Sequence, residues 1–392
     1  MSEKIKRVGI LGGKRGMSFY APINAQPGYR VAGVAEKVPE RLEALRTRVE
    51  PDTALCSSYE ELVSLGIDVI VLANYFHEHC RYAIRAMEAG IDVISDTTAA
   101  PTAGDCLDLV ECVERTGRKY FLAANCPVMV GPSELIRRYR AGELGEVLYA
   151  EAEYLHILGD TEESAAANLY PEIDHWRRYL PGTYYNMHSL GVLMAATGLT
   201  PRRVTAMEIY TEKHAAKVHL KANRSPGAIA LYEMDNGALF RSTGCCGFGP
   251  NGKWYRLSCE GGTIETTRLN QDRVLFRPNG APAEEYDPEA QYTEEEKKSG
   301  HGGADMRICR KACTYLSGGD PGVYLDIYAA AALSLAAVYG LYSILDGKSY
   351  DIPDIRDKAA REVLRGDYRN PFPDPERPID IPCSAHEMNV LK

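Results

Sequence analysis

The chain has 392 residues and a formal net charge of −9. A chain of this length is expected to form two domains, and its acidity argues against binding to nucleic acid, which requires a basic face. We identify no 18-residue apolar run in the sequence, so no membrane-spanning segment is expected.

The first predicted element is a short apolar strand, Val8–Leu11, which ends at a cluster of glycines. A strand that turns through glycines into a helix presents unpaired backbone N–H groups to a phosphate. A second apolar run ends in Glu36, at the spacing where an acidic residue binds the adenosine ribose in dinucleotide-binding folds. These features predict a nucleotide-binding turn made by Gly12, Gly13, Lys14, Arg15 and Gly16.

The glycine pattern departs from Gly-x-Gly-x-x-Gly. Lys14 replaces the second glycine and Met17 replaces the third, unless the turn is one residue shorter and uses Gly16. A side chain at position 14 crowds a bound pyrophosphate unless it turns outward, and its charge is able to contact a phosphate.

Strands and helices alternate over residues 1–125, which predicts a doubly wound parallel (Rossmann) α/β domain. The predicted strands are Val8–Leu11, Tyr29–Ala35, Val69–Ala73, Asp92–Ser95 and Tyr120–Ala123. The predicted helices between them include Pro39–Val49, Tyr59–Leu65, His79–Ala89 and Ala103–Thr116.

Residues 126–366 are predicted to form an α+β domain with a large, mostly antiparallel sheet and helices on one face. Its first strand is Val147–His156, an alanine-rich helix spans Leu325–Leu345, and residues 367–392 form a proline-rich arm. The other sheet face is left open, and such a face seldom stays bare in a monomer. We therefore expect a homo-oligomer, a dimer or a tetramer, formed through that face.

The cysteines and histidines give no metal site. The eleven cysteines are scattered and odd in number, which indicates reduced thiols and a cytoplasmic protein, as does the lack of a signal-peptide pattern after Met1. His77, Glu78 and His79 are consecutive and cannot all converge on one ion. Cys309 and Cys313 have no nearby partners in the sequence.

Five motifs resemble those of the glucose–fructose oxidoreductase, inositol dehydrogenase and MocA (Gfo/Idh/MocA) family. They are the glycine turn, the Ala73–His79 loop with its following helix, Gly142-Glu-Leu-Gly145, the segment Tyr184–His188, and Gly300–Asp305. The last is typical of a branch that includes NAD-dependent glycosidases. The resemblance implies a Rossmann domain, a second domain with an open-faced sheet, and NAD as cofactor, with NADP not excluded.

The resemblance fails at one informative position. The family's signature Glu-Lys-Pro falls on Asp96-Thr97-Thr98, so a threonine stands where the family has a lysine that hydrogen-bonds the reacting hydroxyl. A threonine hydroxyl donates, accepts or relays a hydrogen bond but is no base at neutral pH.

The residue roles implied by the resemblance fall into three groups. The catalytic candidates are His188, Tyr184 and Thr97, with His188 and Tyr184 expected on one face of a helix. The other cofactor-binding candidates, besides the glycine turn and Glu36, are Asn74, His79 and Asp96. The substrate-binding candidates are His156, Trp176, Arg177, His301 and Asp305.

Three functions compete. The first is an NAD(H)-dependent oxidoreductase acting on a hydroxyl of a sugar, glycoside or cyclitol. The second is a glycoside hydrolase or lyase that uses transient oxidation and elimination. The third is a family member without turnover that binds a sugar or a partner, which the loss of the lysine and of the central glycine would explain.

Overall fold

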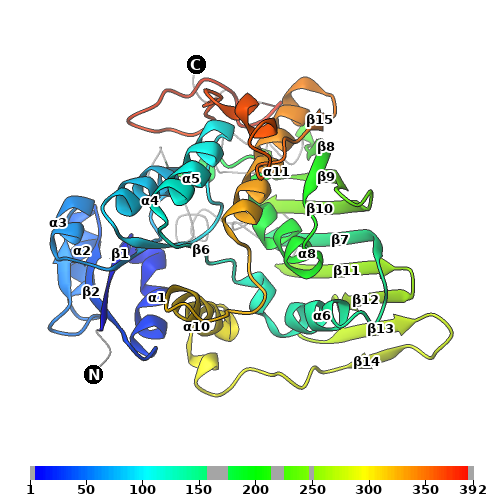
Figure 1. The fold of residues 1–392 in the computed structure, drawn as a ribbon, viewed down its shortest axis with the longest axis horizontal. Coiled ribbons are helices and arrows are strands. Elements are labelled where there is room, and N and C mark those ends of the chain that lie inside the picture. The colour runs from blue at the N-terminus through cyan, green and yellow to red at the C-terminus, as the bar shows by residue number, and fades with distance from the viewer. Residues whose placement is uncertain (1–4, 157–174, 213–224, 247–250, 387–392) are drawn as a thin grey trace. The chain divides into compact units, whose positions relative to one another are not determined.

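The computed structural model describes residues 5–156, 175–212, 225–246 and 251–386 (Figure 1). The chain forms two compact units. The first contains residues 1–100, 108–128 and 292–327, and the second contains residues 101–107, 129–291 and 328–392. The sequence predicted contiguous domains, and the return of residues 292–327 to the first unit was not anticipated.

The first unit is built on a six-stranded parallel sheet with the strand order β3-β2-β1-β4-β5-β6. This order is that of a doubly wound dinucleotide-binding fold and confirms the predicted fold class. The strands are β1 (Lys6–Leu11), β2 (Tyr29–Ala35), β3 (Ala54–Cys56), β4 (Val69–Leu72), β5 (Asp92–Ser95) and β6 (Tyr120–Leu122). The sequence missed only β3, which has three residues.

Crossover helices connect these parallel strands. They are α1 (Gly13–Asn24), α2 (Pro39–Leu45), α3 (Tyr59–Ser64), α4 (His79–Glu88) and α5 (Ala103–Thr116), with 3₁₀ turns η1 (Phe76–Glu78) and η2 (Cys126–Val128). Strand β4 is buried and apolar throughout, and β1 is buried from Val8 onward, as expected for central strands of a parallel sheet.

Helix α10 (Ala304–Leu316) packs against α1 in this unit, preceded by the 3₁₀ turns η5 (Glu296–Lys298) and η6 (His301–Gly303). Two side chains of the sheet fix its C-terminal end. Tyr29 Oη donates to the carbonyl of Cys313 at 2.9 Å, and Lys6 Nζ donates to the carbonyl of Leu316 at 2.8 Å. Such long-range pairs leave no local signal, which is why the sequence did not reveal this return.

The second unit is built on a nine-stranded sheet with the order β14-β13-β12-β11-β7-β10-β9-β8-β15. Among the described strands of this sheet only β7 and β10 pair in parallel, so the prediction of a mostly antiparallel sheet is confirmed. The strands are β7 (Val147–His156), β8 (Pro201–Ile209), β9 (Gly227–Met234), β10 (Leu239–Cys246), β11 (Gly252–Cys259), β12 (Gly262–Thr266), β13 (Val274–Pro278), β14 (Glu284–Tyr286) and β15 (Tyr350–Asp351).

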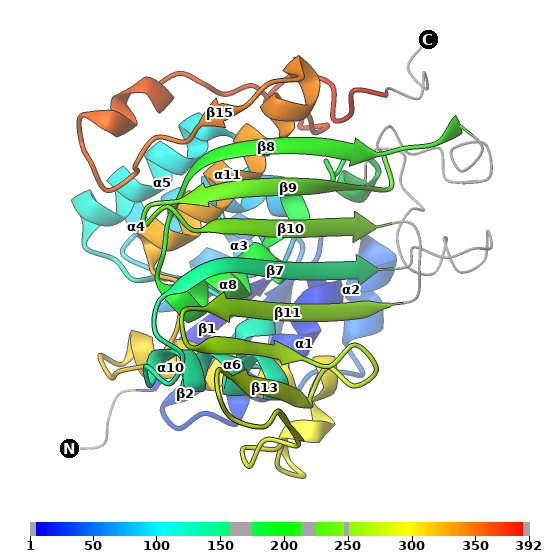
Figure 2. The ribbon, with the colours of Figure 1, turned by 90° about the vertical axis from the view of Figure 1, so that its right-hand side faces the viewer.

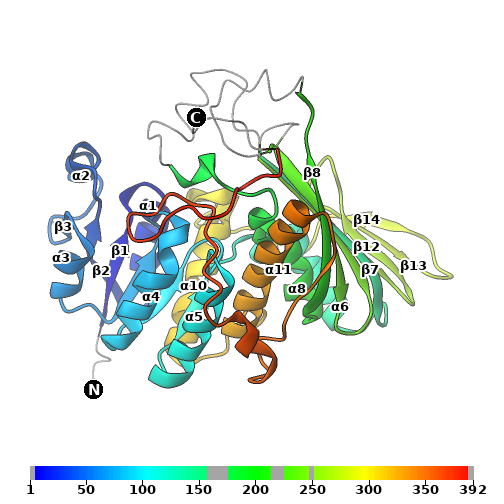
Figure 3. The same ribbon diagram turned by 90° about the horizontal axis from the view of Figure 1, so that it is seen from above.

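Helices cover one face of this sheet (Figure 3). They are α6 (Val130–Arg140), α8 (Leu190–Thr197) and α11 (Ile327–Asp346), and the 3₁₀ turns of the unit are η3 (Trp176–Arg178), η4 (Tyr184–His188) and η7 (Ala360–Leu364). Figure 2 shows the opposite face, over which no helix among the unit's described residues passes. Apolar side chains lie exposed on the strands of this unit at Leu148, Met207, Ile229, Leu231 and Leu239.

Helix α11 corrects the expectation that no segment is apolar enough to span a membrane. Its 20 residues have a mean hydropathy of 1.6, enough by length and composition to cross one. Most of the helix is buried inside the second unit, where residues 330–344 face other protein atoms. Its apolar character is therefore explained as that of a core helix. The proline-rich arm after Asp367 has no helix or strand of its own in its described part, 367–386.

Candidate active site

The glycine turn between β1 and α1 is shorter by one residue than the standard pattern. Helix α1 begins at Gly13, directly after Gly12, which has φ +101°. A Cβ at Gly12 would lie 2.5 Å from the carbonyl oxygen of Ala73, and a Cβ at Gly16 would lie 2.4 Å from Cγ2 of Ile10. Gly16 therefore allows the close helix–strand approach, and Met17 does not need to be glycine. Lys14 lies exposed in the first turn of the helix.

Glu36 lies at the end of β2 and is tied to this turn. One carboxylate oxygen accepts from the Gly13 N–H at 3.0 Å, and the other accepts from the Val38 N–H at 3.1 Å. A carboxylate has about four acceptor positions, so capacity remains for the hydroxyls of a ribose. Lys37, the next residue, is held over the ring of Tyr75, with 4.1 Å between Nζ and the ring centroid.

Unpaired polar atoms mark the carboxyl ends of three neighbouring strands. Asn74, Thr97 and Asn125 follow β4, β5 and β6, and each has a buried side-chain oxygen with no hydrogen-bond partner within the described residues. Buried polar atoms are rarely left unpaired, and ligands in such sheets bind at this edge. These oxygens fit a polar ligand. Asn125 was not among the predicted site residues, although its place directly after a strand was a usable signal.

Thr97 also has a strained backbone. Its φ is +57°, a left-handed conformation that β-branched residues rarely adopt. A hydroxyl without a partner on a strained residue is a feature of functional sites, where surrounding structure holds the strain in place.

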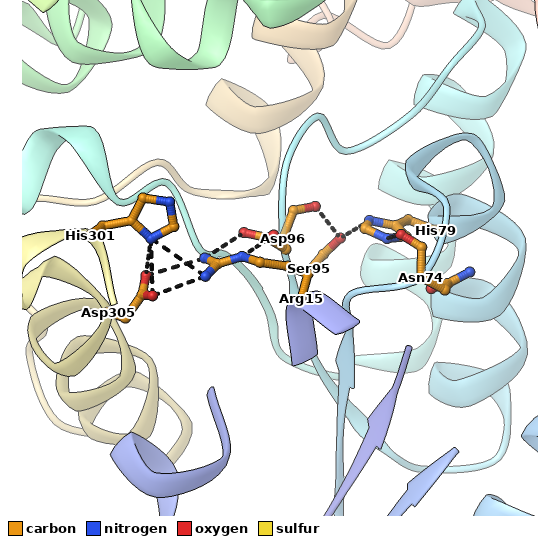
Figure 4. A network of polar contacts seen from close by, with 7 residues as sticks. All are labelled: Arg15, Asn74, His79, Ser95, Asp96, His301 and Asp305. Carbon is orange, nitrogen blue, oxygen red and sulfur yellow. Dashed lines mark hydrogen bonds and ion pairs between the residues drawn. The ribbon is translucent and has the colours of Figure 1, made fainter. Parts of the chain in front are cut away.

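Arg15 joins two carboxylates within the first unit (Figure 4). Its Nε donates to Asp96 at 2.8 Å and its Nη1 donates to Asp305 at 2.9 Å. The side chain of Asp305 is fully buried, and that of Asp96 is about nine-tenths buried. Although burial opposes the charge, the two carboxylates raise the pKa of Arg15. The guanidinium of Arg15 is held by these carboxylates, and the binding of the cofactor by Arg15 stays a prediction.

His301 extends this network to the surface. Its Nδ1 lies 3.0 Å from both oxygens of Asp305, and its side chain is 42% exposed. Burial raises the pKa of Asp305, but hydrogen bonds from His301 and Arg15 outweigh it and lower the pKa to about 2. Asp305 is therefore an anion at neutral pH, and Nδ1 of His301 carries the hydrogen that it accepts. His301 and Asp305, two of the five residues predicted to bind the substrate, therefore form a hydrogen-bonded pair.

His79 lies at the other side of Figure 4 and is almost fully buried. Its Nε2 lies 3.2 Å from the carbonyl of Asn74, and its Nδ1 lies 3.2 Å from Oγ of Ser95. Burial lowers the pKa of His79 to about 4, so the ring is neutral and donates from Nε2. Both ring nitrogens are occupied, and the binding of the cofactor by His79 stays a prediction.

The second unit gathers a cluster of aromatic rings and histidines. The ring of His188 stacks on Tyr154 at 4.4 Å and lies 5.3 Å from Tyr185. The ring centroid of Tyr154 also lies 6.0 Å from that of His156, two residues further along β7. The ring centroids of Trp176 and Tyr185 lie 6.2 Å apart, and Cζ of Arg177 lies 4.9 Å from the centroid of the Trp176 ring. The structure thus brings His156, Trp176 and Arg177 together with His188.

Tyr184 does not share the face of His188, and this expectation was wrong. Residues 184–188 form a 3₁₀ helix, in which residues three apart are aligned, so Tyr185 rather than Tyr184 lies beside His188. Tyr184 is fully buried and donates to the carbonyl of Pro101 at 2.8 Å. Burial raises its pKa well above the ordinary value, which excludes a role as a proton acceptor. Tyr185 was not predicted as a site residue because the sequence analysis used α-helical spacing for residues 184–188.

Comparison with known proteins supports the dinucleotide-binding fold of the first unit. Residues 6–124 match the family model described as "Oxidoreductase family, NAD-binding Rossmann fold". This part of the chain is similar to the Gfo/Idh/MocA oxidoreductase family. The resemblance noted in the sequence is confirmed, and so is NAD as the cofactor.

Curated relatives match about half of the chain. "Glycosyl hydrolase family 109 protein 4" of Phocaeicola vulgatus is 28% identical over 207 residues, covering 50% of this chain and 39% of the relative. A glycosyl hydrolase family 109 protein of Solibacter usitatus is 28% identical over 203 residues, covering 47% of this chain and 45% of the relative. The match spans less than half the length of these relatives.

Solved structures share the fold of nearly the whole chain. An oxidoreductase from Agrobacterium radiobacter in complex with NAD+, L-tartaric acid and magnesium has a TM-score of 0.72 at 13% identity, covering 89% of this chain and 99% of that one. Scyllo-inositol dehydrogenase from Lactobacillus casei has a TM-score of 0.70 at 12% identity, covering 89% and 99%. At these identities the likeness shows the fold alone.

Proposed function

We propose that the protein is an NAD-dependent oxidoreductase that acts on a hydroxyl group of a sugar, glycoside or cyclitol. The observation that carries the substrate class is the cluster of Tyr154, Tyr185, Trp176 and His188 in the second unit. Flat aromatic faces pack against the C–H faces of a sugar ring, and imidazole and guanidinium groups bind its hydroxyls.

The residues of the first unit fit NAD. Glu36 binds the Gly13 N–H, but the α1 N-terminus offers further backbone N–H groups, and the first turn itself contains no acidic side chain. Glu36 retains acceptor capacity for a ribose, and the unpaired oxygens of Asn74 and Asn125 suit an amide donor. When bound, NAD+ supplies the hydride acceptor for oxidation of an alcohol.

Oxidation of a secondary alcohol to a ketone releases one proton, which the chain must accept. His188 is the predicted acceptor, because an imidazole titrates near neutrality and its ring is fixed by Tyr154 and Tyr185. The Thr97 hydroxyl, which has no partner, relays a hydrogen bond in place of the lysine. The burial of the nine described cysteines, with no disulfide among them, supports a reducing, cytoplasmic location.

A second function has specific support. The relatives named glycosyl hydrolase family 109 favour a redox-neutral glycosidase, in which transient oxidation precedes elimination of the aglycone. A family member without turnover is the third possibility, since Thr97 replaces the lysine.

One experiment separates the three functions. The purified chain is incubated with NAD+ and a panel of inositols, aldoses and p-nitrophenyl glycosides, while NADH absorbance and p-nitrophenol are recorded. Net NADH formation is expected. Release of p-nitrophenol without net NADH would favour the glycosidase. NAD+ binding by calorimetry without either signal would favour the binding protein.

A further inference from the structure

His188 lies at a break in the helical structure of the second unit. It ends the 3₁₀ turn η4, and the next residue, Ser189, has φ −115° and ψ −81°, outside helical values. Across this break the N–H of Val192 donates to the carbonyl of Ser189 at 3.1 Å. In a continuous α-helix the same N–H would donate to the carbonyl of His188. The carbonyl of His188 is therefore left for a different donor.

That donor is a tyrosine of the sheet. Tyr255, on β11, is fully buried, and its hydroxyl donates to the carbonyl of His188 at 2.6 Å. Tyr255 lies opposite Ala152 of β7, so it shares a sheet face with Tyr154, two residues further along that strand. Tyr154 stacks on the ring of His188 with 4.4 Å between the ring centroids. Two tyrosines of one sheet face thus hold His188, one at its main chain and the other at its ring.

The residue after His188 is held by another strand. Ser189 Oγ and Ser242 Oγ, on β10, lie 2.7 Å apart, and both side chains are buried. Gly244, two residues further along β10, allows the chain before η4 to come this close, because a Cβ there would lie 2.5 Å from the carbonyl oxygen of Gly182. The segment that carries His188 therefore lies directly against the sheet.

Helix α11 holds the earlier residues of the same segment. Thr183 Oγ1 donates to the carbonyl of Ala337 at 2.8 Å, and Asn186 Nδ2 donates to the carbonyl of Leu333 at 2.9 Å. Leu333 and Ala337 are about one helical turn apart, so one face of α11 binds the segment. The segment is thus bonded to α11 at its beginning and to the sheet at its end, where His188 lies.

From these contacts we infer that Tyr255, together with Ser242, positions His188 for the reaction by fixing the main chain that carries the imidazole. The inference rests on the proposed function, in which His188 accepts the proton of the alcohol. Proton transfer requires the acceptor nitrogen within hydrogen-bond distance of the hydroxyl, and a displacement of about 1 Å costs up to about 10²-fold in rate. Tyr255 and Ser242 are positioning residues, because they act through the main chain at residues 188 and 189.

Tyr255→Phe removes the hydroxyl and keeps the ring. Tyr29→Phe is the matched control, because the Tyr29 hydroxyl also belongs to a buried tyrosine and donates to a main-chain carbonyl, that of Cys313, at 2.9 Å in the first unit. Ser242→Ala removes the second contact and takes the place of Tyr255→Phe in every comparison if that variant does not fold. For each variant, kcat and KM are measured with the fastest substrate of the panel, NAD+ affinity by calorimetry and stability by thermal unfolding.

We expect Tyr255→Phe to lower kcat by about 10–10²-fold and to change the KM and the NAD+ affinity much less. Tyr29→Phe should lower the melting temperature to a similar extent and leave kcat unchanged. In a chain that already carries His188→Asn, Tyr255→Phe should not lower the residual turnover further, because it acts through the imidazole. A purely structural role would instead lower turnover equally in both backgrounds.

A spectroscopic measurement tests the same inference without turnover. In protein with isotope-labelled histidine, the ring signal of His188 is the nuclear magnetic resonance signal that His188→Asn removes. Tyr255→Phe should shift this signal, and Tyr29→Phe should leave it in place. An unshifted signal or a wild-type kcat in Tyr255→Phe would overturn this inference and leave the proposed function intact. A wild type that turns over no compound of the panel would overturn the proposed function, and with it the role of both residues in the reaction.

Discussion

Arg15 and Asp305 are 290 positions apart in the sequence, yet their side chains form an ion pair of 2.9 Å with the carboxylate fully buried. An ionised Asp305 therefore contributes stability that depends on pH. The pKa of its carboxyl falls from 3.8, the ordinary value, to about 2 in the folded chain. The contribution is complete above pH 3.8 and is lost as the pH falls through about 2.

We expect the wild type to lose about 2 kcal/mol of unfolding free energy from this group between pH 5 and pH 2. Asp305→Asn should lower stability at pH 7 and flatten this part of the pH dependence. Urea unfolding at several pH values measures both effects, with Asp351→Asn, an exposed carboxylate, as the control. A pH dependence that Asp305→Asn leaves unchanged would contradict the assignment.

Glu36 is expected to select NAD over NADP. Its ionised carboxylate repels a 2′-phosphate, whereas Lys37 is held over Tyr75. Glu36→Ala should weaken NAD+ binding by about 1.5–3 kcal/mol, the usual value for a hydrogen bond to a charged group, and should narrow the difference from NADP+. Calorimetry with both nucleotides tests this, and Glu40→Ala is the control in the following helix. An unchanged NAD+ affinity would rule out the predicted placement of the cofactor.

The 3₁₀ geometry of residues 184–188 gives opposite expectations for two adjacent tyrosines. Tyr184→Phe removes a buried hydrogen bond to Pro101 and should lower stability by about 1–3 kcal/mol without changing KM. Tyr185→Ala removes a ring beside His188 and should raise the KM for the sugar. Steady-state kinetics measures the KM of both variants, and thermal unfolding measures their stability. A larger KM effect for Tyr184→Phe would restore the α-helical interpretation.

The sequence predicted elements better than it predicted contacts. The strand Tyr29–Ala35 and the helix Ala103–Thr116 have the predicted bounds, because apolar periodicity and flanking turn residues are local signals. The ion pair between Arg15 and Asp305 was not predicted, because Asp305 lies far along the chain and a basic residue in a glycine turn resembles a phosphate ligand. The 3₁₀ turn at Tyr184 was missed because its residues are also compatible with an α-helix.

The bare face of the nine-stranded sheet is expected to join copies of this chain. Met207, Ile229 and Leu231 are exposed on its neighbouring strands β8 and β9. A charge introduced there should block association, because it would be buried without a partner. We expect the wild type to be a dimer or tetramer by light scattering and Ile229→Glu to be a monomer. Leu269→Glu, at a fully exposed residue outside the sheet, is the control. A monomeric wild type at micromolar concentration would contradict this prediction.

Thr97 provides the last test, because its strain and its chemistry can be separated. Glycine relieves a φ of +57°, so Thr97→Gly should raise stability by about 1 kcal/mol or more while removing the hydroxyl relay. Thr97→Lys restores the family's lysine but keeps the strained backbone. If the proton now passes to His188, a lysine at this position places a second cation beside Asp96 and Arg15, and we expect turnover to fall at least tenfold. Kinetics and thermal unfolding of the two variants, with Thr116→Lys as a control away from the strand ends, measure these effects. A rise in turnover for Thr97→Lys would show instead that the chain has drifted from a lysine-dependent dehydrogenase and that His188 has not replaced that lysine.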